Sequence, residues 1–522
     1  MISGRTIAKG AAVVMAATLL SRMFGFIRDM VIANYFGATG ATDAYQATYP
    51  VLIGIGLAIA ASVSAGFIPV FNSYLVSGDR ENALKVVNTL LNLLFFLLLI
   101  VTMIGTFSVP VPDLVKIFAP GFKGESVQLT GQLIRIMLPS LIFVSLMGIA
   151  SGFLNSRQHF LFPALGPIFT SLSIIGSIVF LDPSLGVKRL AIGTFVGFGL
   201  QFLIQLPAMY KKGFRYKLEL AVLHPGVVRV FKLMLPVLAA SMAPPLILLV
   251  ERRLASGLDT GSISTLTYAF RLMQLPQGLF VMAVSIPLFP ALSALAAQKD
   301  FKKLKETLAK GMGVLAVIMI PASAGLIALA VPIVRLLFER GAFEAKDTLP
   351  TAYALVFYSL ALGPLALRDI FRRGFYSLQD TFTTVVVTLL SFLVNVVLDL
   401  ALVEVMGIGG LALGASLSVL IEVSLLYYLF SRKMKGLTFK SFGINLIKII
   451  IASIVMGVVA YYTSTFLGGM MNLGSNFARL LQVGVSICLG LIVYVVAVII
   501  LKVEVVQDAF QMIKDVFRKF AK

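Results

Sequence analysis

The feature that most constrains this chain is the recurrence of long apolar stretches along its whole length. Each is roughly twenty residues or longer, enough to cross the hydrocarbon core of a membrane as a helix. Because backbone polar groups in lipid must be paired within their own segment, helices are the expected structure. The chain has about 14 such stretches, which begin near Ile7, Thr42, Ala83, Val127, Phe160, Leu190, Val227, Ser262, Leu308, Leu349, Thr381, Gly407, Leu446 and Ala478. The sequence therefore predicts an all-α polytopic membrane protein.

Composition excludes several other classes of protein. Charged residues make up 13% of the chain and hydrophobic residues 59%, whereas soluble proteins carry about 25% charged residues. The formal net charge is +20, but most basic residues lie between the apolar stretches, which indicates topology and lipid contact rather than nucleic-acid binding. With one cysteine and two histidines, the chain has no internal disulfide and almost no ligands for zinc or haem.

Lysine and arginine predict the orientation, since they concentrate on the cytoplasmic side of a membrane protein. Basic clusters follow the even-numbered stretches, and both termini are therefore expected in the cytoplasm. The clusters include Arg80 and Lys85, Lys211 to Lys217, Lys299 to Lys305, Arg372 and Arg373, and Arg432 to Lys440. Residues 503–522 have apolar residues at helical spacing, so we expect an amphipathic tail along the cytoplasmic interface. A solvated helix packed on a loop is the alternative for this tail.

Two segments of the chain resemble each other at an offset of roughly 220 residues, which marks a duplicated unit. The first contains VKIFAPGF from Val115 and GFLNSRQHF from Gly152, and the second contains VRLLFERGAF from Val334 and GFYSLQDTF from Gly374. Six stretches separate the copies, so both copies face the same way across the membrane. We expect a six-helix N-terminal lobe over residues 1–218, a six-helix C-terminal lobe over 219–436 and a central cleft. Two additional helices occupy 437–502.

Several charged residues fall inside the predicted spans, where a charge costs about 2.5–3.5 kcal/mol. The first span carries Arg22, Arg28 and Asp29, Asp43 opens the second, and Arg271 lies in the eighth. Their distances from the span ends place Arg22 and Arg271 near the midplane. Arginines facing a shared cavity suit an anionic group such as phosphate, with Asp29 and Asp43 orienting them. The alternative is an interhelical salt bridge of Arg28, Asp29 and Asp43 that only stabilises the lobe.

A second polar group is a candidate site for a coupling ion. Glu251 lies at the outer end of the seventh span, and Asn395 and Asp399 share one face of the eleventh because they are four residues apart. A carboxylate and an amide in this arrangement suit Na⁺ or a proton. A buried polar pair bonded to a neighbouring helix is the alternative. The chain has no GxxxxGK[ST] loop and no nucleophile paired with a base, so we expect neither ATP hydrolysis nor enzyme activity, and no cofactor beyond Na⁺ or H⁺.

At these residues the chain resembles the MurJ (MviN) family of lipid II flippases. The resemblance lies in SRMFGFIRDMVIANYFGA with the following TDAY, in FAPGF at Phe118–Phe122, in FRLMQLPQGLF at Phe270–Phe280, in LLFERGAF at Leu336–Phe343 and in GFYSLQDT at Gly374–Thr381. It implies a V-shaped two-lobe transporter in the inner membrane of a bacterium, which moves lipid II, a peptidoglycan precursor, to the outer leaflet by alternating access. We expect the protein to be monomeric. It also implies a cationic cavity formed by Arg22, Arg28, Asp29, Asp43 and Arg271, and a groove at 437–502 for the polyprenyl tail.

The chain departs from the family pattern at two places. After TDA the family usually has a Pro-Asn pair, one or two arginines and an acidic residue, but this chain has no charge between Asp43 and Asp79. Gln274 stands where the family has the acid of RLMEFP. A flippase for another polyprenyl-diphosphate-linked glycan, such as a precursor of O-antigen or exopolysaccharide, therefore stays an alternative.

Three further classes of function are less compatible with the sequence. A cation-coupled drug exporter needs an apolar or acidic cavity, and midplane arginines oppose this. A membrane enzyme needs acidic catalytic residues in sizeable loops, and the loops here are short. A structural scaffold gives no reason for charges inside the lobes.

Overall fold

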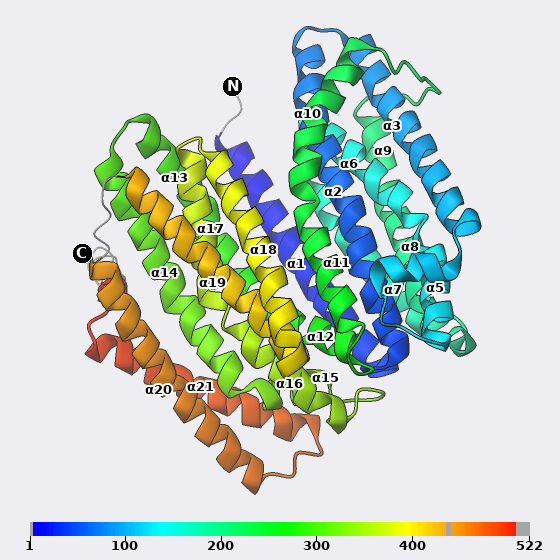
Figure 1. Cartoon of the computed structure of the whole chain (residues 1–522). Coiled ribbons are helices and arrows are strands. Elements are labelled where there is room, and N and C mark those ends of the chain that lie inside the picture. The colour runs from blue at the N-terminus through cyan, green and yellow to red at the C-terminus, as the bar shows by residue number, and fades with distance from the viewer. Residues whose placement is uncertain (1–3, 435–439, 508–522) are drawn as a thin grey trace. The chain divides into compact units, whose positions relative to one another are not determined.

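The computed structural model describes residues 4–434 and 440–507, and these residues contain no strand (Figure 1). In the first half the elements are α1 (Gly4–Phe36), α2 (Gly40–Val76), α3 (Arg80–Met103), the π-helix η1 (Ile104–Ser108), α4 (Val111–Phe118), α5 (Glu125–Met137), α6 (Ser140–Ser156), α7 (Leu161–Phe180), η2 (Pro183–Leu185), α8 (Lys188–Leu203), α9 (Gln205–Lys211), α10 (Pro225–Ser241) and α11 (Ala243–Ala255). The second half contains α12 (Ser262–Pro276), the π-helix η3 (Gln277–Val281), α13 (Met282–Ala297), α14 (Phe301–Ala328), α15 (Ala330–Phe338), α16 (Ala345–Ser359), α17 (Leu362–Ser377), α18 (Thr381–Met406), α19 (Ile408–Lys433), α20 (Lys440–Met470) and α21 (Asn476–Ile500). The predicted all-α class is confirmed.

Twelve helices among the described residues are long and apolar enough to span a membrane. They match twelve of the predicted spans, and several consist of two consecutive helices, such as α5 with α6 and α16 with α17. The other two predicted spans correspond to α1 and to the stretch from α12 to α13, whose side chains are described only in part. The count of 14 is therefore close but not confirmed. The predicted amphipathic tail lies outside the described residues from residue 508 onward.

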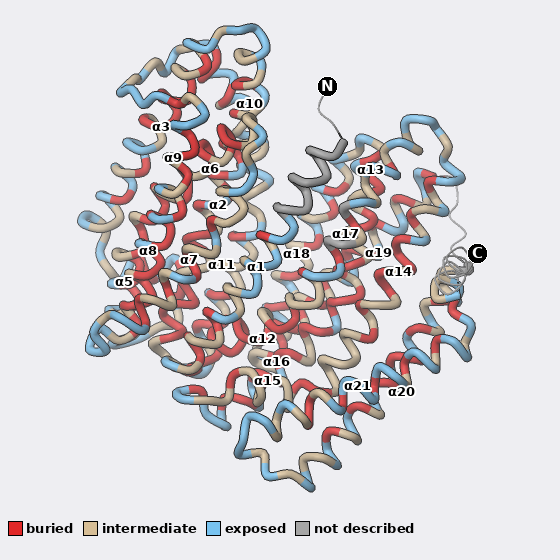
Figure 2. The backbone as a smooth tube through the Cα atoms, turned by 180° about the vertical axis from the view of Figure 1, so that it is seen from behind, coloured by how far each residue is buried: buried red, intermediate tan, exposed pale blue. Residues whose placement is uncertain are grey.

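The membrane environment explains the distribution of residues around α18. Its exposed face is apolar and includes Phe382, Leu389, Leu393 and Val397, whereas its buried face carries polar side chains. This is the reverse of a helix in a soluble protein, because lipid solvates apolar side chains and polar groups must find partners inside the bundle. Figure 2 shows such alternation of buried and exposed residues along the helices. The buried polar residues of α18 are Thr384, Ser391, Asn395 and Asp399.

Aspartates explain where several spans begin. Asp79, Asp300 and Asp380 each precede a helix and accept a hydrogen bond from a backbone N–H three residues later, which pairs one of the open donors at a helix start. Hydrogen bonds from the side chain and backbone of Asn82 lower the pKa of Asp79. These caps mark the boundary between loop and span at α3, α14 and α18.

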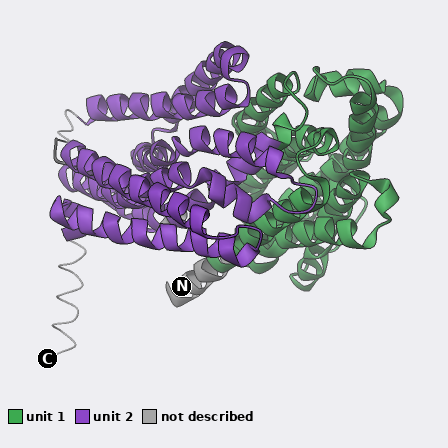
Figure 3. Cartoon of the chain, turned by 90° about the horizontal axis from the view of Figure 1, so that it is seen from below, with its two compact units in different colours: residues 1–264 green, residues 265–522 purple. Residues whose placement is uncertain are grey.

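The chain divides into two compact units, residues 1–264 (unit 1) and 265–522 (unit 2) (Figure 3). In unit 1, α2 packs against α6 and α10. Phe67, Phe71, Phe153 and Phe214 are completely or almost completely buried in its core. These packing units differ from the lobes expected from the repeat, 1–218 and 219–436, because α10 and α11 follow the first repeat copy yet pack against α2.

In unit 2, the two C-terminal helices α20 and α21 pack against each other and against α14. Met456 and Tyr494 are buried at this contact, and the Tyr494 hydroxyl donates to the Val317 carbonyl at 2.7 Å. Arg479 at the start of α21 contacts Glu339 after α15 at 3.0 Å. These contacts hold the additional pair of helices onto the rest of the unit.

Candidate functional site

Arg28 and Asp29 form a buried ion pair on α1. Both side chains are almost inaccessible, and the Nε and Nη2 atoms of Arg28 donate to Asp29 Oδ1 at 3.0 and 2.8 Å. The Nη1 atom of Arg28 donates to the Tyr49 hydroxyl at 3.2 Å, and its guanidinium lies 5.6 Å from the centre of the Tyr49 ring. Tyr49 in turn stacks on Tyr45. The arginine is thus held in one orientation by a carboxylate and an aromatic ring.

Arg22, which lies further toward the N-terminus of α1, is exposed in the structure. Its neighbour Met23 is 59% exposed, so this part of α1 presents side chains outward. The difference between the two arginines is therefore one of environment: Arg28 is locked in a pair and Arg22 is accessible.

Asp43 has a different partner from the one that the sequence suggested. Its Oδ2 atom accepts from the Gly261 backbone at 2.6 Å, and its Oδ1 atom accepts from the Ser264 backbone and hydroxyl at 2.7 and 2.6 Å. Both carboxylate oxygens are occupied by the first turn of α12 and the residue before it. Asp43 therefore fixes the start of α12, because open backbone donors at a helix start favour a carboxylate, and it does not orient an arginine.

Arg271 lies on α12, between one and two turns before η3. It is partly buried, and its Nη1 atom reaches Gln274 Oε1 at 3.4 Å, a long contact to a neutral acceptor. π-helical turns are rare and are frequent at functional sites. The structure thus places the arginine of the RLM motif beside an irregular turn of the same helix.

The candidate coupling residues lie on two elements. Glu251 is partly buried on α11 of unit 1, while Asn395 and Asp399 are buried on α18 of unit 2. The Asn395 Nδ2 atom donates to Asp399 Oδ1 at 3.2 Å. A Cβ atom on Gly414 of α19 would overlap this carboxylate oxygen, so only glycine lets α19 approach Asp399. Among the described residues, no group of three His, Cys, Asp or Glu side chains is placed to hold a metal ion.

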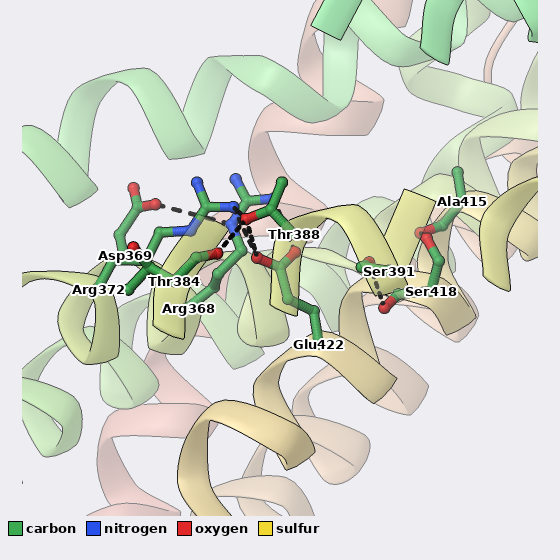
Figure 4. A network of polar contacts seen from close by, with 9 residues as sticks. All are labelled: Arg368, Asp369, Arg372, Thr384, Thr388, Ser391, Ala415, Ser418 and Glu422. Carbon is green, nitrogen blue, oxygen red and sulfur yellow. Dashed lines mark hydrogen bonds and ion pairs between the residues drawn. The ribbon is translucent and has the colours of Figure 1, made fainter. Parts of the chain in front are cut away.

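A charged network in unit 2 was not recognised as a site from the sequence (Figure 4). Glu422 on α19 is buried, and its carboxylate contacts Arg372 at 2.6 Å and Arg368 at 3.6 Å. Arg372 also donates to the Thr388 hydroxyl on α18 at 2.8 Å. In the sequence Arg372 is a basic residue at the end of the tenth span, and Arg368 lies within that span next to Asp369. A lone glutamate in the apolar stretch after Gly407 is the signal that points to Glu422.

A family model described as lipid II flippase MurJ matches residues 32–482. This chain belongs to the MurJ family. The probable lipid II flippase MurJ of Vibrio cholerae is 32% identical over 431 residues, which cover 80% of this chain and 82% of the relative. The probable lipid II flippase MurJ of Synechocystis is 28% identical and covers 96% of both chains.

Solved structures agree with the MurJ family assignment. A lipid II flippase MurJ in an inward closed conformation has a TM-score of 0.78 and 27% identity, and covers 93% of this chain and 98% of that chain. An inward-facing multidrug resistance transporter of the MATE family has a TM-score of 0.68 at 16% identity, and covers 81% of this chain and 98% of its own. The latter likeness shows the shared fold alone. The segment that matches the MurJ family model includes Asp43, Arg271, Asn395 and Asp399, and it begins after Arg22, Arg28 and Asp29.

Proposed function

We propose that this protein moves lipid II from the inner to the outer leaflet of the cytoplasmic membrane by alternating access, as a step of peptidoglycan synthesis. The observation that carries the proposal is the match of residues 32–482 to the MurJ family, whose named members are lipid II flippases. The protein is a transporter and not an enzyme. The membrane-spanning helices of the structure support this assignment.

The arginines are the groups that we assign to the diphosphate of the substrate. Arginine stays charged and offers a planar pair of donors that fits phosphate oxygens. In this assignment Arg22, Arg28 and Arg271 bind the diphosphate, and Asp29 keeps Arg28 oriented through its contacts of 2.8 and 3.0 Å. Asp43 contributes indirectly, since it holds the start of the helix that carries Arg271.

A cavity in unit 2 supports a place for the polyprenyl tail. It has a volume of about 930 Å³ and lies among α14, α15, α16, α19, α20 and α21. Apolar side chains such as Ile327, Val331 and Leu349 line it, and Arg335, Tyr353 and Gln482 supply polar atoms. Apolar cavities of this size are typical of sites for hydrophobic ligands. We place the tail beside the C-terminal pair of helices for this reason.

The alternative substrate is another polyprenyl-diphosphate-linked glycan. It is favoured by Gln274 at a position where the family has an acid, and by the absence of charge between Asp43 and Asp79. Two measurements on the full-length protein separate the substrates: complementation of a strain depleted of its lipid II flippase, and binding of purified protein to lipid II. We expect both to succeed. A protein that accumulates in the membrane yet neither complements nor binds lipid II carries a different glycan.

The orientation of the protein gives a testable prediction. We expect the loop before α14 in the cytoplasm and the loop before α16 outside, because lysine and arginine concentrate on the cytoplasmic side. Lys303→Cys and Lys346→Cys, each in a variant that lacks Cys488, place single thiols at exposed positions next to these loops. Gly341 is less suitable because its φ of 58° would strain a cysteine. In intact cells a membrane-impermeant maleimide should label the Lys346→Cys variant but not the Lys303→Cys variant; the reverse pattern contradicts the orientation.

We also propose that Asn395 and Asp399 bind the coupling ion, Na⁺ or H⁺, with a contribution from Glu251. A buried carboxylate next to an amide is costly in a membrane unless it binds an ion or a partner. Asp399→Asn, which keeps the shape, should make transport insensitive to Na⁺ and to membrane potential. Glu404→Gln, at an exposed position of the same helix, is the matched control. If Asp399→Asn keeps the parent's dependence on both, the residue is structural.

A further inference from the structure

The charged network around Glu422 has one carboxylate close to its arginines and one more distant. Arg368 and Arg372 share the single carboxylate of Glu422. Asp369, the other acid nearby, approaches Arg368 Nε only at 3.8 Å. Arg372 thus has a close carboxylate at 2.6 Å, whereas the printed carboxylate contacts of Arg368 are 3.6 and 3.8 Å long. In the membrane a guanidinium without a close carboxylate favours a further polar or anionic partner.

The two guanidinium groups also have unused donors. Arg372 contacts Glu422 and Thr388 through Nη2, and Arg368 contacts Glu422 through Nη1. Nη1 of Arg372 and Nη2 of Arg368 have no protein partner among the described residues. In Figure 4 each guanidinium has a nitrogen on the side away from Glu422. One open donor from each arginine is therefore available to an additional acceptor.

The two arginine side chains are more exposed than the side chain of Glu422. The side chains of Arg368 and Arg372 are 20% and 25% exposed, whereas that of Glu422 is 3% exposed. A ligand can therefore reach the arginines but not the carboxylate beneath them. Glu422 holds both guanidinium groups in place, as Asp29 holds Arg28 in unit 1.

The corresponding positions of the first repeat copy carry no charge. The repeat aligns Gly374 with Gly152, which places Leu146 and Ala150 of α6 at the positions of Arg368 and Arg372. In α8, Gln201 has the same spacing from Gly193 as Glu422 has from Gly414 in α19. A neutral hydrogen bond from Thr170 to Gln201, 2.7 Å long, is present there. The charged network of unit 2 therefore has no charged counterpart at these positions of unit 1.

We propose that Arg368 and Arg372 form a second anion-binding site, positioned by Glu422, that takes a carboxylate or a phosphate. The planar donors of arginine match both groups. The anion has two possible sources. One is an acidic group of the substrate headgroup, and for this source the inference rests on the proposed function. The other source is the headgroup of an anionic phospholipid, which carries the same chemistry.

The test uses the full-length protein with Arg368→Gln, Arg372→Gln and Glu422→Gln combined. This triple variant removes both arginines together with the carboxylate that they share, and glutamine at the Glu422 position matches what unit 1 has at Gln201. Arg373→Gln on the same helix is the control, since Glu422 makes its ion pairs with the other two arginines. Native mass spectrometry measures two quantities for each protein: lipid II bound in a titration, and phosphatidylglycerol retained from mixed phosphatidylglycerol–phosphatidylcholine vesicles.

We expect the triple variant to fold and to lose about tenfold to hundredfold in affinity for one of the two anions, as is typical for lost charge-assisted contacts. A loss for lipid II alone identifies the substrate headgroup as the source, and a loss for phosphatidylglycerol alone identifies the phospholipid. If the triple variant binds both as the parent does, the site does not exist. Failure of the parent to bind lipid II contradicts the proposed function, while the phosphatidylglycerol measurement still decides whether the second site exists.

Discussion

Replacing Arg271 with alanine is expected to abolish nearly all lipid II transport, while lysine at this position keeps part of it. Lysine retains the charge but not the planar fork that binds two phosphate oxygens. Loss of one charge-assisted contact costs about 1.5–3 kcal/mol, roughly a tenfold to hundredfold loss of affinity. Protein abundance is measured for each variant, so that lost transport is separated from lost protein.

The measurement combines complementation of a flippase-depleted strain with titration of purified protein by lipid II. Arg229→Ala, at an exposed arginine of α10, is the matched control and should complement fully. Arg22→Ala, another accessible arginine, should resemble Arg271→Ala. Normal accumulation, full complementation and unchanged lipid II binding by the alanine variants at both positions would show that these arginines do not bind the diphosphate.

Asp43→Ala should destabilise unit 1 by about 2–5 kcal/mol, because hydrogen bonds to a charged group contribute roughly 1.5–3 kcal/mol each and buried donors that lose their acceptor add to the cost. The substitution removes the acceptor of three hydrogen bonds and leaves the backbone N–H groups of Gly261 and Ser264 without their partner. The start of α12 would lose its attachment to α2. We expect low abundance in the membrane and a lower unfolding temperature in detergent.

Asp182→Ala is the control for this effect. Asp182 also accepts from a backbone N–H, that of Ser184, but it lies in an exposed loop, so its loss should change stability little. Asp43→Asn keeps one acceptor oxygen and should lie between parent and alanine variant. If Asp43→Ala accumulates and unfolds like the parent but does not transport, Asp43 acts in transport and not in holding α12.

The apolar stretches were sufficient to predict the helices because span length depends on local sequence and membrane thickness alone. The all-α class and twelve of the spans were predicted in this way and are confirmed. The family was predicted from the resemblance of short motifs and is also confirmed. The repeat was also predicted from the sequence, because the segments that begin at Val115 and Gly152 resemble those that begin at Val334 and Gly374. The orientation and the repeat-based lobes stay predictions.

The partners of charged residues could not be predicted in the same way. Asp43 was recognised as a costly charge, but its partners Gly261 and Ser264 lie 218 and 221 residues away. Arg372 was noted only as a basic residue at a span end, while its partner Glu422 is 50 residues further along the chain on another helix. Arg28 and Asp29 are the exception, because adjacent residues need no tertiary contact to meet.

The sequence by itself therefore determined that this chain is a helical membrane protein of the MurJ family, and which residues carry charge inside the spans. Only the tertiary structure decided that Asp43 holds a helix start, that Arg28 is locked in a pair, and that Arg368 and Arg372 share one carboxylate. Hydrophobicity acts on each segment separately and can be read along the chain. A hydrogen bond or ion pair depends on the distance and direction between side chains, which helix packing alone sets.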